Sequence, residues 1–279
     1  MAKPIKIGLC LSGGGAKGIA HIGVLKALRE SGIFPDVVSG TSAGSVVGAL
    51  YAAGKTPEEM IDFVRDGSLF KIYKVIMPSD GLTKLTYIKE KLQAVIPNDS
   101  FEALARPLYV AVTNLITGNC EIKSSGALFD VIMASSSIPL VFSPVEIDGQ
   151  LYVDGGMLSN FPVQPLIGKS DVIIGVNLMP QEPISEKSIQ NIIGIATRCF
   201  SLSVWSNTQP QLKYCDMVIA PPNIEQYNIF QFSRYKELVE VGYEAALDRI
   251  PELLEIIDTA RKEKKKAAEK KKGKKVKGK

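Results

Sequence analysis

The sequence predicts an α/β protein with three layers, in which helices cover both faces of a mainly parallel sheet. Ile5–Leu11 is a nearly continuous apolar run, which is typical of a parallel strand buried on both faces. Patterns of strand, loop and helix then alternate twice within about 50 residues, as in βαβ units. Hydrophobic residues make up 46% of the 279-residue chain and charged residues 22%, a balance typical of a packed globular protein.

The two N-terminal units each place a loop directly after a strand. Three consecutive glycines, Gly13–Gly15, follow the first strand, and Gly40 follows the second. Apolar side chains recur at helical spacing after each loop, and Gly54 stands where a helix C-terminus favours glycine. We therefore predict helices over Ala16–Glu30 and Ser45–Ala53 and a strand over Val37–Ser39.

The rest of the chain adds further strands, a hairpin and three helices. Asp148-Gly149 separates two short strands and suits the positive φ angles of a two-residue type I′ turn. The predicted strands are Leu108–Asn114, Val145–Ile147, Gln150–Val153, Val172–Asn177 and Met217–Ala220. The predicted helices are Ala127–Ser135, Ser185 to about Ser206, and a helix from about Phe232 into the tail.

The chain divides by charge into an acidic body and a basic tail. Residues 1–260 hold 21 basic and 27 acidic side chains, and we expect them to form one domain. Residues 261–279 hold 12 basic and 2 acidic side chains, and we expect a solvated extension of the last helix that becomes disordered. The alternative is an electrostatic anchor for anionic lipid or RNA. Because the body is acidic, the net charge of +4 does not indicate a nucleic-acid groove.

Composition excludes several classes of site. The chain has one histidine, His21, and four cysteines without a CxxC pair, which argues against a zinc site and against a disulfide scaffold. No apolar stretch reaches the roughly 18 residues of a spanning helix, and the N-terminus lacks a signal-peptide pattern. We therefore expect a cytoplasmic protein, with peripheral contact to an anionic membrane through the Lys-rich tail as an option.

The segment Gly40-Thr41-Ser42-Ala43-Gly44 is a GxSxG sequence between a predicted strand and a predicted helix. A nucleophile elbow requires that placement, because the chain must turn sharply so that the serine hydroxyl projects above the edge of the sheet. The flanking glycines avoid side-chain clashes in the turn. The alternative is structural, since serine is also a common residue at a helix N-terminus.

The glycine-rich loop Gly13–Gly15 precedes a helix, where several backbone N–H groups can point at one anion. That anion is either a phosphate or the oxyanion of an acyl-transfer intermediate. The spacing Gly13-x-Gly15-x-x-Gly18 also fits the dinucleotide fingerprint. The fingerprint needs an acidic residue at the end of the second strand, and this strand ends in Ser39-Gly40.

Asp154 follows the second strand of the hairpin, where it forms either a simple Asp-Gly turn or the acidic partner of Ser42. No histidine follows Ser42 and no acidic residue precedes His21, so the common orders of Ser-His-Asp enzymes do not fit. His21 lies in the first helix in line with Leu25, which favours a packing role. A nucleophilic Ser42 would therefore use a carboxylate as its base.

These motifs resemble those of the patatin-like phospholipases, in the bacterial single-domain branch. The resemblance covers most of residues 5–220 and rests on four segments in the same order: Gly13–Leu25, Gly40–Ser45, Ala134–Val145 and Asp154–Pro162. It implies a Ser-Asp dyad of Ser42 and Asp154, and an oxyanion hole formed by Gly13, Gly14 and Gly15. Lys17 stands where many members have arginine, which keeps the charge but loses the bidentate geometry.

The sequence thus predicts a serine hydrolase that cleaves lipid acyl esters, of the phospholipase A or lysophospholipase type, through an acyl-enzyme. The N–H of Ala43 is expected to assist the glycine loop, and neither a metal nor an organic cofactor is implied. Two alternatives are a non-catalytic lipid-binding module and a nucleotide-binding oxidoreductase that uses the glycine loop. The apolar segment Ser68–Leu85 is expected either to pack in the core or to cover the mouth of the site and meet lipid.

Overall fold

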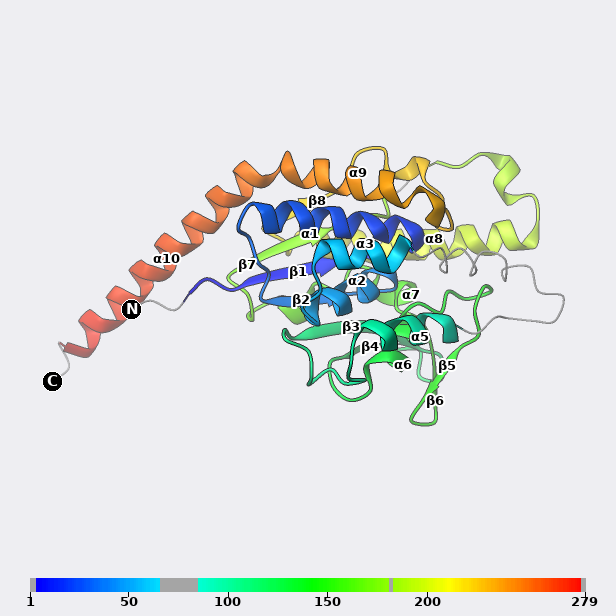
Figure 1. Ribbon diagram of the computed structural model, residues 1–279, viewed down its shortest axis with the longest axis horizontal. Coiled ribbons are helices and arrows are strands. Elements are labelled where there is room, and N and C mark those ends of the chain that lie inside the picture. The colour runs from blue at the N-terminus through cyan, green and yellow to red at the C-terminus, as the bar shows by residue number, and fades with distance from the viewer. Residues whose placement is uncertain (1–3, 66–84, 181–182, 277–279) are drawn as a thin grey trace.

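The predicted α/β/α layers are present in a computed structural model, which describes residues 4–65, 85–180 and 183–276 (Figure 1). The sheet follows the order β5-β6-β3-β2-β1-β7-β8, with β4 paired to β3. Its strands are β1 (Ile7–Leu11), β2 (Val37–Gly40), β3 (Leu108–Asn114), β4 (Cys120–Lys123), β5 (Val145–Ile147), β6 (Gln150–Asp154), β7 (Val172–Val176) and β8 (Met217–Ile219). Apart from Leu85, the apolar segment Ser68–Leu85 lies outside the described residues.

The centre of the sheet is parallel and one edge is antiparallel. Strand β1 pairs in parallel with β2 and β7, and β2 pairs in parallel with β3. Strands β4 and β6 run antiparallel to β3, and β5 runs antiparallel to β6. In the β5–β6 turn, Asp148 has φ 51° and Gly149 has φ 73°, which confirms the predicted pair of positive φ angles.

Helices lie on both faces of this sheet, and α1, α2, α3 and α9 share one of them (Figure 1). The helices are α1 (Ala20–Glu30), α2 (Ala43–Ala52), α3 (Pro57–Arg65), α5 (Thr86–Val95), α6 (Leu128–Ser135), α7 (Gly156–Ser159), α8 (Ile192–Leu212), α9 (Tyr235–Leu247) and α10 (Ile250–Val276). Alternation along β1 divides the core: Leu9 and Leu11 join the large cluster beneath α1 and α2, and Cys10 joins a smaller cluster with Phe161 on the opposite face.

Several boundaries differ from the prediction. A 3₁₀ turn, Gly15–Ile19, precedes α1, so the first helix begins later than Ala16. Helix α8 begins at Ile192, after a separate 3₁₀ turn, whereas the sequence places the start of this helix at Ser185. The predicted last helix is two helices, α9 and α10, and α10 continues through the Lys-rich segment to Val276. The domain boundary at residue 260 and disorder beyond it stay predictions.

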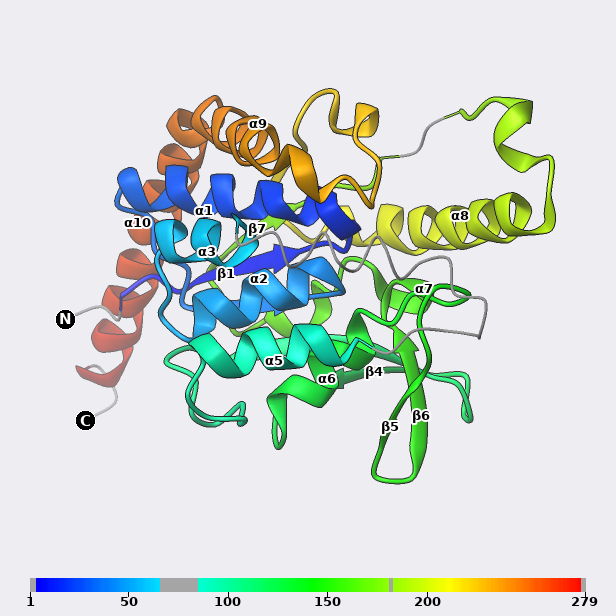
Figure 2. The same cartoon turned by 45° about the vertical axis from the view of Figure 1, so that its right-hand side comes forward.

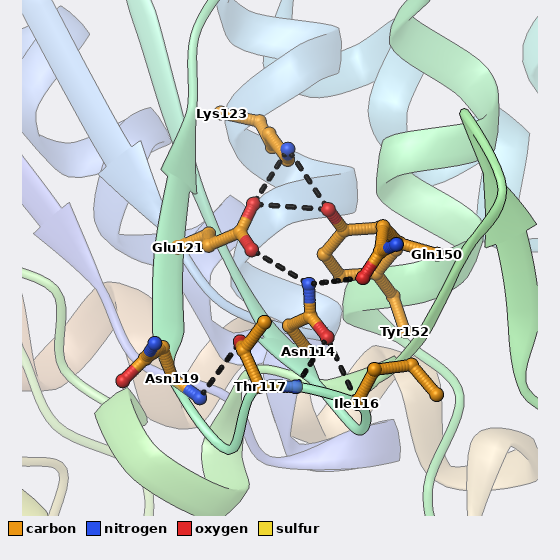
Figure 3. Close-up of polar contacts among 8 residues, drawn as sticks. All are labelled: Asn114, Ile116, Thr117, Asn119, Glu121, Lys123, Gln150 and Tyr152. Carbon is orange, nitrogen blue, oxygen red and sulfur yellow. Dashed lines mark hydrogen bonds and ion pairs between the residues drawn. The ribbon is translucent and has the colours of Figure 1, made fainter.

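A polar network joins β4 and β6 across β3, as Figure 3 shows. Lys123 Nζ lies 2.7 Å from Glu121 Oε2 and 3.2 Å from the Tyr152 hydroxyl, which itself donates to Glu121 at 3.0 Å. Asn114 Nδ2 donates to the other Glu121 oxygen at 2.8 Å. These bonds hold the register of β6 on β3, and β6 ends at Asp154.

Helices α1 and α9 approach each other closely because each has a glycine at the crossing. A Cβ atom on Gly23 would lie 1.9 Å from the carbonyl oxygen of Val239, and one on Gly242 would lie 2.0 Å from the carbonyl oxygen of Ala20. Both obstacles are backbone atoms, which cannot rotate away as a side chain can. The α1–α9 distance therefore depends on these two glycines.

We predict that Gly23→Ala lowers the free energy of unfolding by about 2–3 kcal/mol, because the added methyl group forces the two backbones apart. Urea denaturation of the purified variant measures this change. Glu240→Ala is the matched control, since Glu240 is exposed on α9 and its truncation should change stability by less than about 0.5 kcal/mol. Equal stability of Gly23→Ala and the parent chain would contradict the close crossing.

Candidate active site

The ends of β2 and β6 meet on the same strand, and this brings Ser42 and Asp154 together. Gly40, at the end of β2, is aligned with Val110 of β3, and Asp154, at the end of β6, is aligned with Val112. The two partner positions are separated by about 7 Å along β3. Ser42 and Asp154 line one small pocket, and the Ser42 hydroxyl favours the ionised form of the Asp154 carboxyl group and so opposes the rise in its pKa.

Ser42 occupies the sharp turn that the GxSxG sequence predicts. Its φ is 52° and its ψ is −125°, a conformation that non-glycine residues adopt only under strain. A Cβ atom on Gly40 would lie 2.5 Å from the carbonyl oxygen of Gly44, and one on Gly44 would lie 2.3 Å from that of Leu11. Both flanking glycines are therefore required so that the turn can pack against the end of β1.

One turn at the C-terminal end of α6 holds both residues. The Ser135 hydroxyl accepts a hydrogen bond from the Ser42 N–H at 2.9 Å and donates to the Ala111 carbonyl at 2.8 Å. Two residues later, the Ser137 carbonyl accepts from the Asp154 N–H at 2.9 Å. This serine-rich segment, which carries part of the family resemblance, thus positions the backbones of both Ser42 and Asp154.

Asp154 is a buried carboxyl group with few polar neighbours. Burial raises its pKa to about 7, and hydrogen bonds from the Gly156 N–H and the Ser42 hydroxyl oppose that rise. The Gly156 bond is 2.7 Å long. At neutral pH the group is therefore divided between its ionised and protonated forms, as a proton acceptor near its operating pH must be.

The glycine loop contributes backbone to the same small pocket as Ser42 and Asp154. Gly14 and Gly15 line this pocket, and Ala43 begins the helix that follows Ser42. Within the described part of the chain, the N–H groups of Gly14, Gly15 and Ala43 have no hydrogen-bond acceptor. Gly15 has φ 57°, and a Cβ on it would lie 2.4 Å from the carbonyl oxygen of Ile229, so only glycine fits there.

Gly13 does not belong with these donors, which corrects the sequence analysis. Its N–H donates to the Asn160 carbonyl at 3.1 Å, so it holds the loop in place and is not available to an oxyanion. The backbone N–H of Lys17 donates to the Gly14 carbonyl at 3.1 Å and closes the 3₁₀ turn. The Lys17 side chain is buried.

His21 packs in the core, as the sequence analysis expects. Its ring is fully buried, and Nε2 lies 2.8 Å from the carbonyl oxygen of Ser12. Burial lowers its pKa to about 4, so the ring is neutral at neutral pH and donates to that carbonyl. The Ser12 hydroxyl donates to the Gly13 carbonyl at 3.0 Å and accepts from the Leu178 N–H at 2.9 Å. His21 thus supports the base of the glycine loop.

An apolar cavity opens beside Ser42. Its walls come from the 3₁₀ turn before α1, from α1, α2, α3 and α5, and from the loop between β8 and α9. They include Ile22, Val47, Leu50, Phe63, Ile88 and Phe230. Such a cavity accepts a hydrocarbon chain by the hydrophobic effect and offers a charged ligand little compensation for lost water.

We predict that Asp154→Asn raises the free energy of unfolding above pH 7 and has a smaller effect in acid. The folded-state pKa of about 7 exceeds the ordinary value of 3.8, so burial of the ionised group costs stability as pH rises between these values. Removing the charge should therefore raise the free energy of unfolding by about 2–4 kcal/mol at pH 8 and by about 1 kcal/mol at pH 4.5.

Chemical denaturation of both proteins at the two pH values measures the difference. Asp130→Asn is the control, because Asp130 is a half-buried carboxylate that pairs with Lys89 at 2.6 Å. That variant should lose stability or stay unchanged at pH 8. A gain from Asp154→Asn that is equal at both pH values would contradict the raised pKa.

Comparisons with known proteins agree with this geometry. The model of a family described as patatin-like phospholipase matches residues 9–167, more than half of the chain. A Mycobacterium tuberculosis protein named as an uncharacterized NTE family protein is 34% identical over 181 residues, which cover 63% of this chain and 50% of that protein. Lysophospholipase NTE1 of Pyricularia oryzae is 29% identical over 279 residues, which cover 88% of this chain and 18% of that protein. The chain therefore spans half or less of the length of these curated relatives.

Solved structures share the fold at lower identity. Human GIVD cytosolic phospholipase A2 superposes with a TM-score of 0.56 and 11% identity, over 92% of this chain and 60% of that one. VipD from Legionella pneumophila superposes with a TM-score of 0.50 and 19% identity, over 93% of this chain and 68% of that one. The matched family region contains Ser42, Asp154 and the glycine loop, and the chain belongs to the patatin-like phospholipase family.

Proposed function

We propose that this protein hydrolyses the acyl esters of phospholipids or lysophospholipids with a Ser42–Asp154 dyad. The observation that carries the proposal is that Ser42, in a strained turn, shares one small pocket with a buried carboxyl group whose pKa burial raises to about 7. Family membership and the name of the Pyricularia oryzae relative, a lysophospholipase, support a lipid substrate.

In the first half-reaction, Ser42 Oγ attacks the ester carbonyl while its proton passes to Asp154. The developing oxyanion accepts hydrogen bonds from the N–H groups of Gly14, Gly15 and Ala43. Among the described residues these N–H groups have no acceptor, so no existing hydrogen bond must break first. Collapse of the tetrahedral intermediate releases the alcohol, which takes the proton back from Asp154. Water then attacks the acyl-serine by the same route, and the fatty acid leaves.

Because its pKa is raised, the Asp154 carboxylate can accept the Ser42 proton at neutral pH, the role that a histidine has in a Ser-His-Asp triad. A carboxylate with the ordinary pKa near 4 is a weak base at neutral pH, whereas one near 7 is matched to the task. The activity should therefore fall as pH drops below 7, since the protonated group cannot accept the Ser42 proton. His21 takes no part, because its ring is fully buried and Nε2 is engaged by the Ser12 carbonyl.

The apolar cavity beside Ser42 is suited to the acyl chain of the substrate. Its walls are mainly aliphatic and aromatic, and they include Leu50 and Phe63, which do not line the smaller pocket that contains Asp154. The carbonyl carbon at Ser42 would then have the hydrocarbon chain on one side and the alcohol group on the other. Of the two alternatives from the sequence, the nucleotide-binding oxidoreductase gains no support from these contacts, and a non-catalytic lipid-binding module stays an alternative.

We predict that Ser42→Ala and Asp154→Asn each lower esterase activity at least about 1,000-fold, because the first removes the nucleophile and the second removes the group that accepts its proton. His21→Asn is the matched control and should retain activity after correction for the folded fraction. Hydrolysis of a soluble short-chain ester and labelling by a fluorophosphonate probe measure the two effects. A labelled, active Ser42→Ala protein would reject the proposal.

The Lys-rich part of α10 begins beside the N-terminal ends of the parallel strands, whereas this site lies at their C-terminal ends. Lys264 bonds to Asp171 at 2.5 Å and to the Pro4 carbonyl at 2.8 Å, and these two residues precede β7 and β1. Ser42 follows the other end of β2. Electrostatic attraction of the tail to anionic lipid would therefore concentrate the protein at a membrane without directing the site toward it.

Truncation after Ala260 should leave hydrolysis of a soluble ester unchanged and weaken binding to anionic vesicles at low salt. The removed segment carries 12 basic and 2 acidic side chains, each basic group contributing about 1 kcal/mol near an anionic surface. Vesicle sedimentation measures the binding, and the difference should vanish at about 0.5 M salt because of screening. Equal binding of both proteins at low salt would show that the tail is not an anchor.

A further inference from the structure

Helix α8 exposes apolar side chains along one side. Ile192 is 84% exposed, Ile195 is 51% exposed and Leu202 is 40% exposed, and Cys199 is exposed between them. The intervals of three and four residues place these four side chains on a single stripe, which we call the α8 stripe. Of the 21 residues of α8, only Arg198 is charged, which is unusual for a helix that faces water.

The C-terminal half of α8 is fixed beside the candidate dyad. The Ser203 hydroxyl donates to the Met157 carbonyl at 2.7 Å, and Asn207 Nδ2 donates to the Gly156 carbonyl at 2.8 Å. Phe200 and Val204, on the other side of α8 from the stripe, line the pocket that holds Ser42 and Asp154. The helix then extends away from the body, on the side opposite to α10 and the chain ends (Figure 2).

We propose that the α8 stripe inserts into the surface of a lipid bilayer and presents the candidate active site to it; the inference rests on the proposed function. One side of α8 lines the pocket and the other is the stripe, so a bilayer that meets the stripe lies next to the place where its own lipids would react. Residues 1–260 carry more acidic than basic groups, so apolar insertion is the attraction available to this end of the body.

Trp205 lies within one turn of Leu202 on the same helix, is partly buried, and is the single tryptophan of the chain. An indole ring favours the depth of the lipid head groups, where its apolar face and its N–H are both satisfied. Its fluorescence therefore reports the arrival of α8 at a bilayer without any added label. The bound protein should emit at shorter wavelength than the free protein.

The test compares Ile192→Glu/Ile195→Glu with Gln190→Glu/Thr197→Glu on vesicles of phosphatidylcholine. Both double variants add two negative charges to exposed positions of the same segment, and only the first removes the stripe. Phosphatidylcholine has no net charge, so repulsion does not enter. We expect partitioning in a sedimentation assay to fall about 10- to 100-fold for the first variant, with loss of the Trp205 blue shift, and to stay within about 2-fold for the second.

The isoleucine variant should hydrolyse a soluble ester at the parent rate, because Ile192 and Ile195 belong to the stripe and lie on the side of α8 away from Val204 and the pocket. Equal partitioning of the isoleucine variant and the parent protein would overturn the proposal. So would a parent dimer that dissociates in the isoleucine variant without a change in vesicle binding, since the stripe would then contact a second copy. Stripe-dependent binding without hydrolysis of any ester would keep the proposal and reject the proposed function.

Discussion

The short turn that follows α6 determines where the two residues of the candidate dyad lie. Ser135 fixes the backbone of Ser42 from one side, and the carbonyl of Ser137 fixes the backbone of Asp154 from the other. Strands β2 and β6 both end on β3, and the turn spans the gap between their ends. The strained backbone of Ser42 and the position of the Asp154 carboxylate are therefore consequences of one rigid support. A shift of α6 would separate both groups at once.

Burial of Asp154 gives the site its chemistry at the expense of stability. The same loss of water that raises the pKa of the carboxyl to about 7 makes its ionised form costly in the folded protein. The turn at Ser42 adds backbone strain. Rigid surroundings tolerate both, because Gly40 and Gly44 let α2 pack directly on the end of β1. A neutral His21 strengthens the neighbouring loop through Ser12, and so the only histidine of the chain is a structural residue.

The sequence alone predicts the parts that depend on local pattern. The buried parallel strands, the β5–β6 turn and the turn at Ser42 follow from apolar runs and glycine positions, and the structure agrees with them. Helix α3 was missed although Thr56 and Glu59 form a reciprocal capping box, with bonds of 3.2 and 2.8 Å, which is a recognisable signal. The engagement of Gly13 by Asn160 joins residues about 150 positions apart, and no local pattern encodes such a pairing.

The two ends of the molecule present different surfaces to a membrane. Near the N-terminal ends of the parallel strands, α10 offers a high density of positive charge. Its attraction acts over about 8–10 Å and weakens with salt. At the opposite end of the strands, α8 offers apolar side chains, which act only on contact and are not screened by salt. Only the second surface adjoins the pocket of Ser42 and Asp154, because Phe200 and Val204 belong to both α8 and that pocket. If both proposals hold, attraction by charge and orientation by apolar contact belong to two different helices, and of these two it is α8 that would bring lipid beside the candidate dyad.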